Sequence, residues 1–184
     1  MAETTHAHFD WNTYIELCER LVARVAKSGW QFDSLLCLAR GGMRPGDFFS
    51  RIYGKPLAIM TTSSYREAAG TVQGDLDIAK YITGVTELKG KLLLVDDLCD
   101  SGETIRRVVQ HLRKCYPEVT EIRVAVLWVK ACSVFKPDYS VITFKDSPWI
   151  HQPLSAMTIS AKKCISRSVL KSTATSSDKA STFV

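Results

Sequence analysis

The sequence predicts an α/β fold in which a mainly parallel, five-stranded sheet is flanked by helices. Amphipathic helices alternate along the chain with short apolar runs. Alternation of this kind implies right-handed crossovers and parallel pairing of strands that are covered on both faces. The five apolar runs expected to form strands are residues 34–39, 57–62, 92–95, 122–129 and 139–144.

Three helices are predicted, the first and third by apolar residues that recur with a spacing of three and four and the second by Pro45 at its start. Asp10 is a suitable N-cap for the first helix, Gly54 closes the second, and Pro117 ends the third. The predicted helices cover residues 11–27, 45–53 and 103–115.

Two segments lack a sustained period. Residues 63–80 are polar, and we expect them to form a mobile loop or a weakly paired hairpin. Residues 155–184 are basic and rich in Ser, Thr and Lys, with few large apolar groups, so we expect a disordered tail. The sequence thus predicts one domain over residues 1–154, followed by this tail.

Composition excludes several classes of protein. No apolar run approaches the roughly 20 residues that span a bilayer, and the start of the chain does not resemble a secretory signal. The six cysteines include no C-x-x-C pair, which favours reduced thiols and a cytoplasmic protein. The net charge is +5, but the tail holds most of the excess, so we expect no nucleic-acid partner.

The segment Leu92–Thr104, LLLVDDLCDSGET, has the strongest chemical pattern. An apolar strand leads into Asp96 and Asp97, and Asp100-Ser-Gly-Glu-Thr then opens a helix. The unpaired amides at a helix N-terminus form a site for phosphate. Paired carboxylates suit sugar hydroxyls and a hydrated Mg²⁺. The alternative is a solvated loop with a simple N-cap, but it accounts for only one of the acids.

This segment resembles the phosphoribosyl pyrophosphate signature of the type I phosphoribosyltransferases. That signature is an apolar quartet, two acids, two apolar positions and D-[ST]-G-x-T, and each position is matched here. The wider resemblance covers residues 10–155 and is closest to the 6-oxopurine branch, particularly the bacterial xanthine-guanine enzymes. It implies an enzyme of purine salvage, a small hood built from the chain ends, a Mg²⁺ cofactor and a homo-oligomer.

The resemblance also implies roles for residues around the donor. Asp96 and Asp97 bind the ribose hydroxyls, directly or through the metal. Asp100 acts as general acid/base at N7 of the purine. Arg40 is a second catalytic residue, which binds the leaving pyrophosphate. The 5′-phosphate is held by Asp100, Ser101, Gly102, Glu103 and Thr104, and the pyrophosphate by Arg40, Gly41 and Gly42.

Two of these motifs have a plainer interpretation. Arg40-Gly41-Gly42 taken alone is a turn with a surface arginine. Ser64 and Tyr65 resemble a pair in the family's mobile loop, which closes over the reacting centre, but a solvated loop explains them equally well.

The resemblance assigns the base to Lys130, Trp149 and Ile150. Lys130 bonds the exocyclic O6, Trp149 stacks on the ring, and the backbone beside it reads the edge of the base. A solvated lysine and a core tryptophan are the alternatives. Where that branch commonly has an acid, this chain has His151, which leaves open the preference among xanthine, hypoxanthine and guanine.

Two other functions stay open at this stage. The first is a phosphoribosyltransferase-fold regulator, or an RNA-binding protein, that has no catalytic activity. The second is a transferase for a different nucleobase. His6, His8 and His111 belong to no motif, so we expect a frayed chain end at the first two and no metal at any of them.

Overall fold

The computed structural model describes residues 5–66, 73–78, 82–85 and 87–154. The chain divides into two compact units. The larger unit is residues 15–148, and the smaller one combines residues 1–14 with residues 149–184. The predicted tail, residues 155–184, lies outside the described residues.

The larger unit is built on a six-stranded sheet in the order β4-β3-β2-β5-β6-β7. Five neighbouring strands are parallel, which confirms the predicted sheet, and β4 pairs antiparallel with β3 at one edge. The strands are β2 (Ser34–Ala39), β3 (Leu57–Arg66), β4 (Gln73–Ile78), β5 (Gly90–Cys99), β6 (Val119–Val129) and β7 (Tyr139–Thr143).

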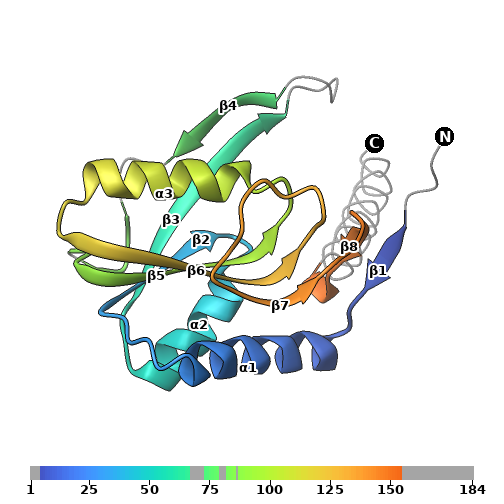
Figure 1. Ribbon diagram of the computed structural model, residues 1–184, viewed down its shortest axis with the longest axis horizontal. Coiled ribbons are helices and arrows are strands. Elements are labelled where there is room, and N and C mark those ends of the chain that lie inside the picture. The colour runs from blue at the N-terminus through green and yellow to red at the C-terminus, as the bar shows by residue number, and fades with distance from the viewer. Residues whose placement is uncertain (1–4, 67–72, 79–81, 86, 155–184) are drawn as a thin grey trace, which may run out of the picture. The chain divides into compact units, whose positions relative to one another are not determined.

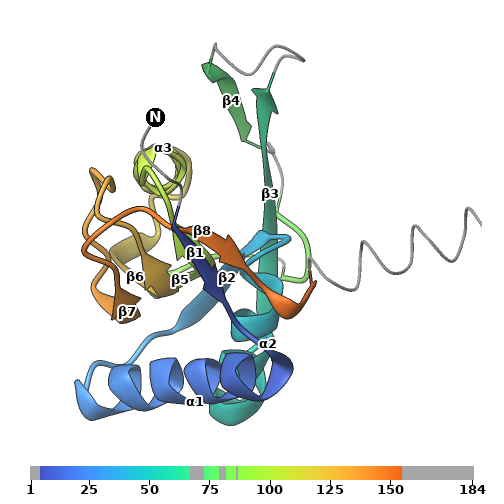
Figure 2. The ribbon, with the colours of Figure 1, turned by 90° about the vertical axis from the view of Figure 1, so that its right-hand side faces the viewer.

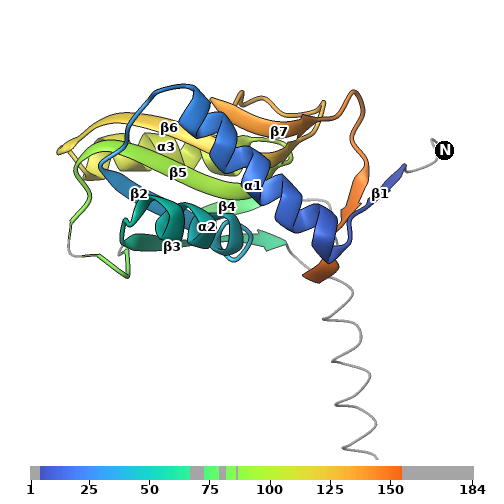
Figure 3. The same ribbon diagram turned by 90° about the horizontal axis from the view of Figure 1, so that it is seen from below.

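Helices cover both faces of this sheet, as predicted (Figure 1). Helix α3 (Glu103–Cys115) lies on one face, and α2 (Met43–Tyr53) lies on the other with most of α1 (Trp11–Lys27) (Figure 3). The apolar stripe of α3 is buried against the sheet through Ile105, Val108, Val109 and Leu112. Burial of such stripes is the main favourable term that fixes the helices on the sheet.

Local signals set the ends of the first two helices. The backbone N–H of Thr13 donates to Oδ1 of Asp10 at 2.8 Å, so Asp10 is the N-cap that the sequence predicts. This hydrogen bond lowers the pKa of the Asp10 carboxyl. Gly54 ends α2 in the left-handed conformation, with φ 62°.

Strand β5 is longer than its apolar core. The sequence places Asp96 and Asp97 at the tip of the strand, but β5 continues to Cys99. The reason is that β6 is long enough to pair with it up to Cys99↔Val129, whereas the pairing with β2 stops at Cys37↔Val95. The two acids therefore lie beyond the end of β2 while the backbone is still held by β6.

Strands β3 and β4 pair as a hairpin that projects away from the other strands of the sheet (Figure 2). Its register includes Ser64↔Leu76, so a paired hairpin, one of the two predicted alternatives, describes this part of the backbone. Ser64 and Tyr65, the predicted lid residues, lie in β3. The connection over residues 67–72 lies outside the described residues.

The smaller unit brings the two chain ends together in a two-stranded parallel sheet of β1 (His6–His8) and β8 (Trp149–His151). The expectation of a frayed end at His6 and His8 was wrong, because backbone pairing with β8 holds both residues in a strand. Among the described residues, no helix is long and apolar enough to cross a membrane.

Candidate active site

The site forms where the direction of the chain crossovers reverses. Strands β2 and β5 are neighbours, but β2 leads through α2 to β3, whereas β5 leads through α3 to β6 on the other side. Ligands of open α/β sheets bind at such a switch point, beyond the carboxyl ends of the strands. The segments that follow these two strands are Arg40–Gly42 and Asp100–Thr104, which are the two predicted motifs.

The Arg40–Gly42 loop lies directly against the paired acids. A Cβ atom placed on Gly41 would be 2.3 Å from Oδ1 of Asp97, and one on Gly42 would be 2.3 Å from the carbonyl oxygen of Val95. Gly42 leaves no room for a side chain, because its near neighbours are backbone atoms, whereas a side chain at Gly41 would require the Asp97 carboxylate to move. The peptide bond between Ala39 and Arg40 is cis. The Arg40 side chain is exposed to solvent.

Asp96 and Asp97 form a crowded pair of carboxylates. Burial raises the pKa of the Asp96 carboxyl well above its usual value, and the charge of Asp97 raises it further. The backbone N–H of Asp97 donates to Oδ1 of Asp96 at 2.9 Å. A bound cation would relieve the repulsion between two such groups. Hard oxygen ligands of this kind fit Mg²⁺.

Asp100 is paired with Lys130 across the ends of β5 and β6. The ammonium Nζ of Lys130 donates to Oδ2 of Asp100 at 3.0 Å. Of the charged residues in the described part of the chain, Lys130 is the buried one, at 8% exposure. The Asp100 side chain is half exposed. The alternative of a solvated strand-end lysine was therefore wrong, since a buried ammonium needs a carboxylate or similar partner.

The start of α3 has the form of a phosphate cradle. Gly102, the N-cap of the helix, has φ 78°, and the backbone N–H of Glu103 donates to Oγ of Ser101 at 3.4 Å. The Glu103 carboxylate bonds Arg106 and Arg107, at 2.7 and 3.0 Å, which lowers its pKa and neutralises its charge. The helix N-terminus therefore keeps its attraction for an anion.

The loop after Lys130 was not predicted as part of the site. The backbone N–H of Val134 donates to the carbonyl oxygen of Ser101 at 2.9 Å, and Sγ of Cys132 lies 3.7 Å from Oδ1 of Asp100. A Cβ on Gly102 would be 2.6 Å from Oγ of Ser133, so this loop also requires glycine at the cradle. No sequence motif marks it, and its position directly after Lys130 is the one signal that could have indicated it.

Trp149 and Ile150 lie in the smaller unit, on β8. Trp149 is 56% exposed, so the alternative of a core tryptophan was wrong. The backbone N–H of Trp149 donates to the carbonyl oxygen of Thr5 at 2.8 Å, which ties the residue to the N-terminal strand. An exposed indole on a paired strand offers a flat apolar face to a ligand.

Comparison with known proteins identifies the class. The sequence model of the phosphoribosyl transferase domain family matches residues 8–157 of this chain. The chain is 30% identical over 144 residues to a xanthine-guanine phosphoribosyltransferase of Vibrio vulnificus, and 28% identical to that of Vibrio atlanticus. Each alignment covers 78% of this chain and 84% of the relative. The xanthine-guanine-hypoxanthine phosphoribosyltransferase of Helicobacter pylori is 26% identical, with a TM-score of 0.71. That structural match covers 86% of this chain and 99% of the other.

The chain therefore belongs to the phosphoribosyltransferase family, and it has the type I fold. Its relatives belong to the 6-oxopurine branch, so the predicted branch is confirmed along with the family. The protein is an enzyme of purine salvage. The roles of its individual residues, including the lid residues Ser64 and Tyr65, stay predictions.

Proposed function

We propose that the protein transfers the 5-phosphoribosyl group of phosphoribosyl pyrophosphate to N9 of a 6-oxopurine, which yields the purine nucleotide and pyrophosphate. The observation that carries this proposal is the pair of Asp100 and Lys130, with 3.0 Å between Oδ2 and Nζ, beside the acids of β5. The pair offers one proton donor and one proton acceptor to the edge of a base.

The spacing of this pair matches the edge of a 6-oxopurine. O6 and N7 of such a base lie about 3 Å apart and are read together by donors in other proteins. The Lys130 ammonium donates to O6, and the Asp100 carboxylate faces a protonated N7. Adenine has an amino group in place of O6, so it would direct a donor at the ammonium. The buried lysine thus favours hypoxanthine, guanine or xanthine as the base.

Asp100 can then move the proton that the reaction releases. The bond from N9 to C1′ of the ribose forms, the bond from C1′ to pyrophosphate oxygen breaks, and the electron pair leaves with the pyrophosphate. The N7 proton passes to the Asp100 carboxylate. Lys130 keeps this carboxylate in place and stabilises its negative charge before the transfer.

The donor occupies the loops around β5. Asp96 and Asp97 accept hydrogen bonds from the ribose hydroxyls. The backbone amides and side-chain hydroxyls of Ser101–Thr104 bind the 5′-phosphate. Arg40, with the amides of Gly41 and Gly42, stabilises the charge that develops on the pyrophosphate. Asp96 and Asp97 are also the residues that would hold Mg²⁺. The ion, when bound, neutralises charge on the leaving group.

Trp149 stacks on the purine, and the backbone of Ile150 reads its edge. Ser64 and Tyr65 belong to a lid that excludes water from the cation-like sugar. The protein works as a homo-oligomer in the cytoplasm.

Turnover with a panel of bases tests the function. The purified chain is incubated with phosphoribosyl pyrophosphate, Mg²⁺ and one of hypoxanthine, guanine, xanthine, adenine, uracil or nicotinate, and nucleotide formation is followed. Turnover with at least one 6-oxopurine, and at least about tenfold less with adenine, is expected from the loss of one charged hydrogen bond. Turnover with uracil or nicotinate alone would mean that the acceptor is not a 6-oxopurine. The absence of turnover with every base would contradict the proposed activity.

A further inference from the structure

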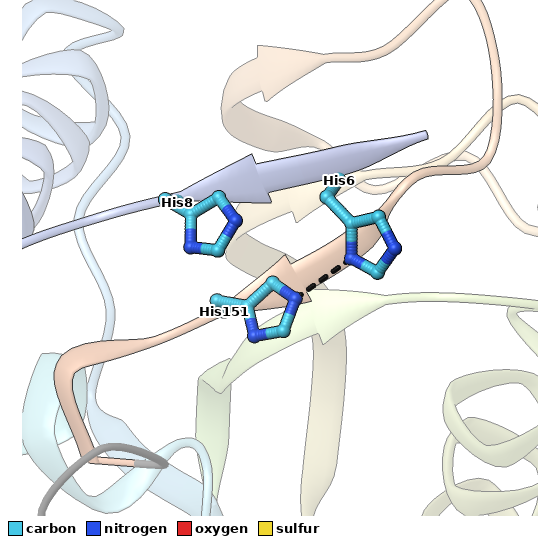
Figure 4. Close-up of side chains that lie close together, drawn as sticks. All are labelled: His6, His8 and His151. Atoms are coloured by element: carbon cyan, nitrogen blue, oxygen red, sulfur yellow. Dashed lines mark hydrogen bonds between the residues drawn. The ribbon is translucent and has the colours of Figure 1, made fainter. Parts of the chain in front are cut away.

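Three histidines come together on the β1–β8 ladder, and one of them, His151, directly follows the predicted base-binding residues Trp149 and Ile150. Figure 4 shows His6 and His8 on β1 and His151 on β8 with their rings turned toward one another. His6 and His8 are two residues apart in a strand, so their side chains lie on the same face. His8 is the direct cross-strand partner of His151 in the parallel register.

The three side chains already lie at the separation of metal ligands. One ring nitrogen from each lies within 4.8 Å of the others. Nδ1 of His6 and Nε2 of His151 are 2.8 Å apart, and the rings of His8 and His151 stack with centroids 4.2 Å apart. Nitrogens around a tetrahedral zinc ion, with bonds of about 2.0–2.1 Å, are about 3.3 Å apart. The rings of His8 and His151 are almost parallel, so at least one of these side chains, which are exposed or partly exposed, must rotate for both nitrogens to face one ion.

The chemistry of the cluster selects the ion. We propose that His6, His8 and His151 form a binding site for one divalent transition-metal ion of the Zn²⁺ type, with water at the remaining position. Neutral imidazole suits zinc, nickel and copper and is a poor ligand for Mg²⁺. The Asp96–Asp97 pair has the opposite preference, so one chain carries two sites for two kinds of cation.

The three histidines lie close enough for one ion to contact all of them. Three positively charged imidazolium rings at this separation would repel one another, whereas three neutral rings can each offer one nitrogen to the same ion. The ion would also join β1 to β8, a ladder of only three residue pairs.

The inference does not depend on the proposed function, because metal binding is measured without substrate. Full-length protein without an affinity tag is stripped with a chelator and titrated with Zn²⁺ in excess Mg²⁺, which occupies the carboxylate sites. One Zn²⁺ per chain is expected, with a dissociation constant in the micromolar range or below. Each of His6→Asn, His8→Asn and His151→Asn should weaken binding at least about tenfold, by analogy with the effect of altering a metal site.

His111 provides the matched control, because it is the fourth histidine and lies on α3, with Nδ1 3.8 Å from Sγ of Cys115. The double variant His111→Gln/Cys115→Ser should bind Zn²⁺ as the unmodified chain does. Loss of binding in this variant, or full binding in a triple variant of His6, His8 and His151, would overturn the proposal. A chain that binds no Zn²⁺ would also overturn the proposal.

X-ray absorption at the zinc edge gives a test that needs no variant. The unmodified chain should show about three imidazole nitrogens at about 2.0 Å. Sulfur ligands near 2.3 Å would assign the ion to cysteines and contradict the site.

Discussion

The donor loop of the larger unit and the histidine ladder of the smaller unit are assembled in opposite ways. The loop is one continuous segment, Asp96–Thr104, in which a strand, a turn and a helix start follow one another along the chain. The ladder joins residues 6 and 8 to residue 151 through a parallel register. The first site can be predicted from the sequence because its residues are consecutive. The second forms only when two strands that are distant in the sequence pair.

The largest expected effect concerns Asp100. Asp100→Asn keeps an oxygen that can accept from Lys130, but an amide cannot take the N7 proton. We expect kcat with hypoxanthine to fall about 10²- to 10⁴-fold, while the affinity for phosphoribosyl pyrophosphate changes little. Steady-state kinetics and calorimetry measure the two quantities. Asp47→Asn, at an exposed ion pair on α2, is the control and should leave both unchanged. Unchanged turnover in Asp100→Asn would remove its role as acid/base.

Gly41→Ala tests the packing of the two loops against each other. The added methyl would meet the Asp97 carboxylate at 2.3 Å, so the acid or the loop must move. A displacement of about 1 Å at a reacting centre costs about 10²-fold, and we expect that loss in kcat/KM for phosphoribosyl pyrophosphate. Met43→Ala, at the exposed start of α2, should retain activity. Full activity in a folded Gly41→Ala protein would mean that the close approach is not needed.

Lys130→Met sharpens the assignment of the base. Methionine keeps the length of the side chain and removes the donor to O6. Loss of one charged hydrogen bond, worth about 1.5–3 kcal/mol, should lower kcat/KM for hypoxanthine about ten- to 100-fold. The kcat/KM for adenine should fall less, so the preference for hypoxanthine over adenine decreases. Lys114→Met, on the exposed side of α3, is the control. An equal loss with both bases would indicate a structural role for the lysine.

Trp149→Ala tests whether the indole on β8 stacks on the base. Stacking of one base on an aromatic side chain is worth about 1–3 kcal/mol, so the KM for hypoxanthine should rise about tenfold. Trp149→Phe keeps a flat apolar face and should restore most of the affinity. The KM for phosphoribosyl pyrophosphate is the internal reference and should not change. An unaltered KM for the base in Trp149→Ala would mean that Trp149 on β8 does not contribute to base binding.

Much of the larger unit follows from local sequence signals. Apolar runs and helical signals predict the five parallel strands and the three helices of the described residues, because the strands are apolar throughout and the helices have one apolar face. The N-cap at Asp10 and the end of α2 at Gly54 follow from residue chemistry at single positions. The Arg40–Gly42 and Asp96–Thr104 motifs lie at the carboxyl ends of adjacent strands, as the fold class requires.

The rest depends on pairing between distant segments. Strand β5 carries its two acids inside the ladder because β6 is long, and nothing in the segment around Asp96 indicates this length. The burial of Lys130 also has no local signal, because its partner Asp100 lies 30 residues earlier in the chain. Strands β1 and β8 have only three residues each, too few for a period to be recognised. The sequence therefore predicted a frayed end at His6 and His8.

The most direct test of the donor site is calorimetric titration of phosphoribosyl pyrophosphate in the presence of Mg²⁺. The unmodified chain should bind one molecule per active site, and the double variant Asp96→Asn/Asp97→Asn should bind at least about tenfold more weakly, as expected for loss of metal and hydroxyl ligands. Equal binding by both proteins would contradict the assignment of the donor to β5 and the loop that follows it.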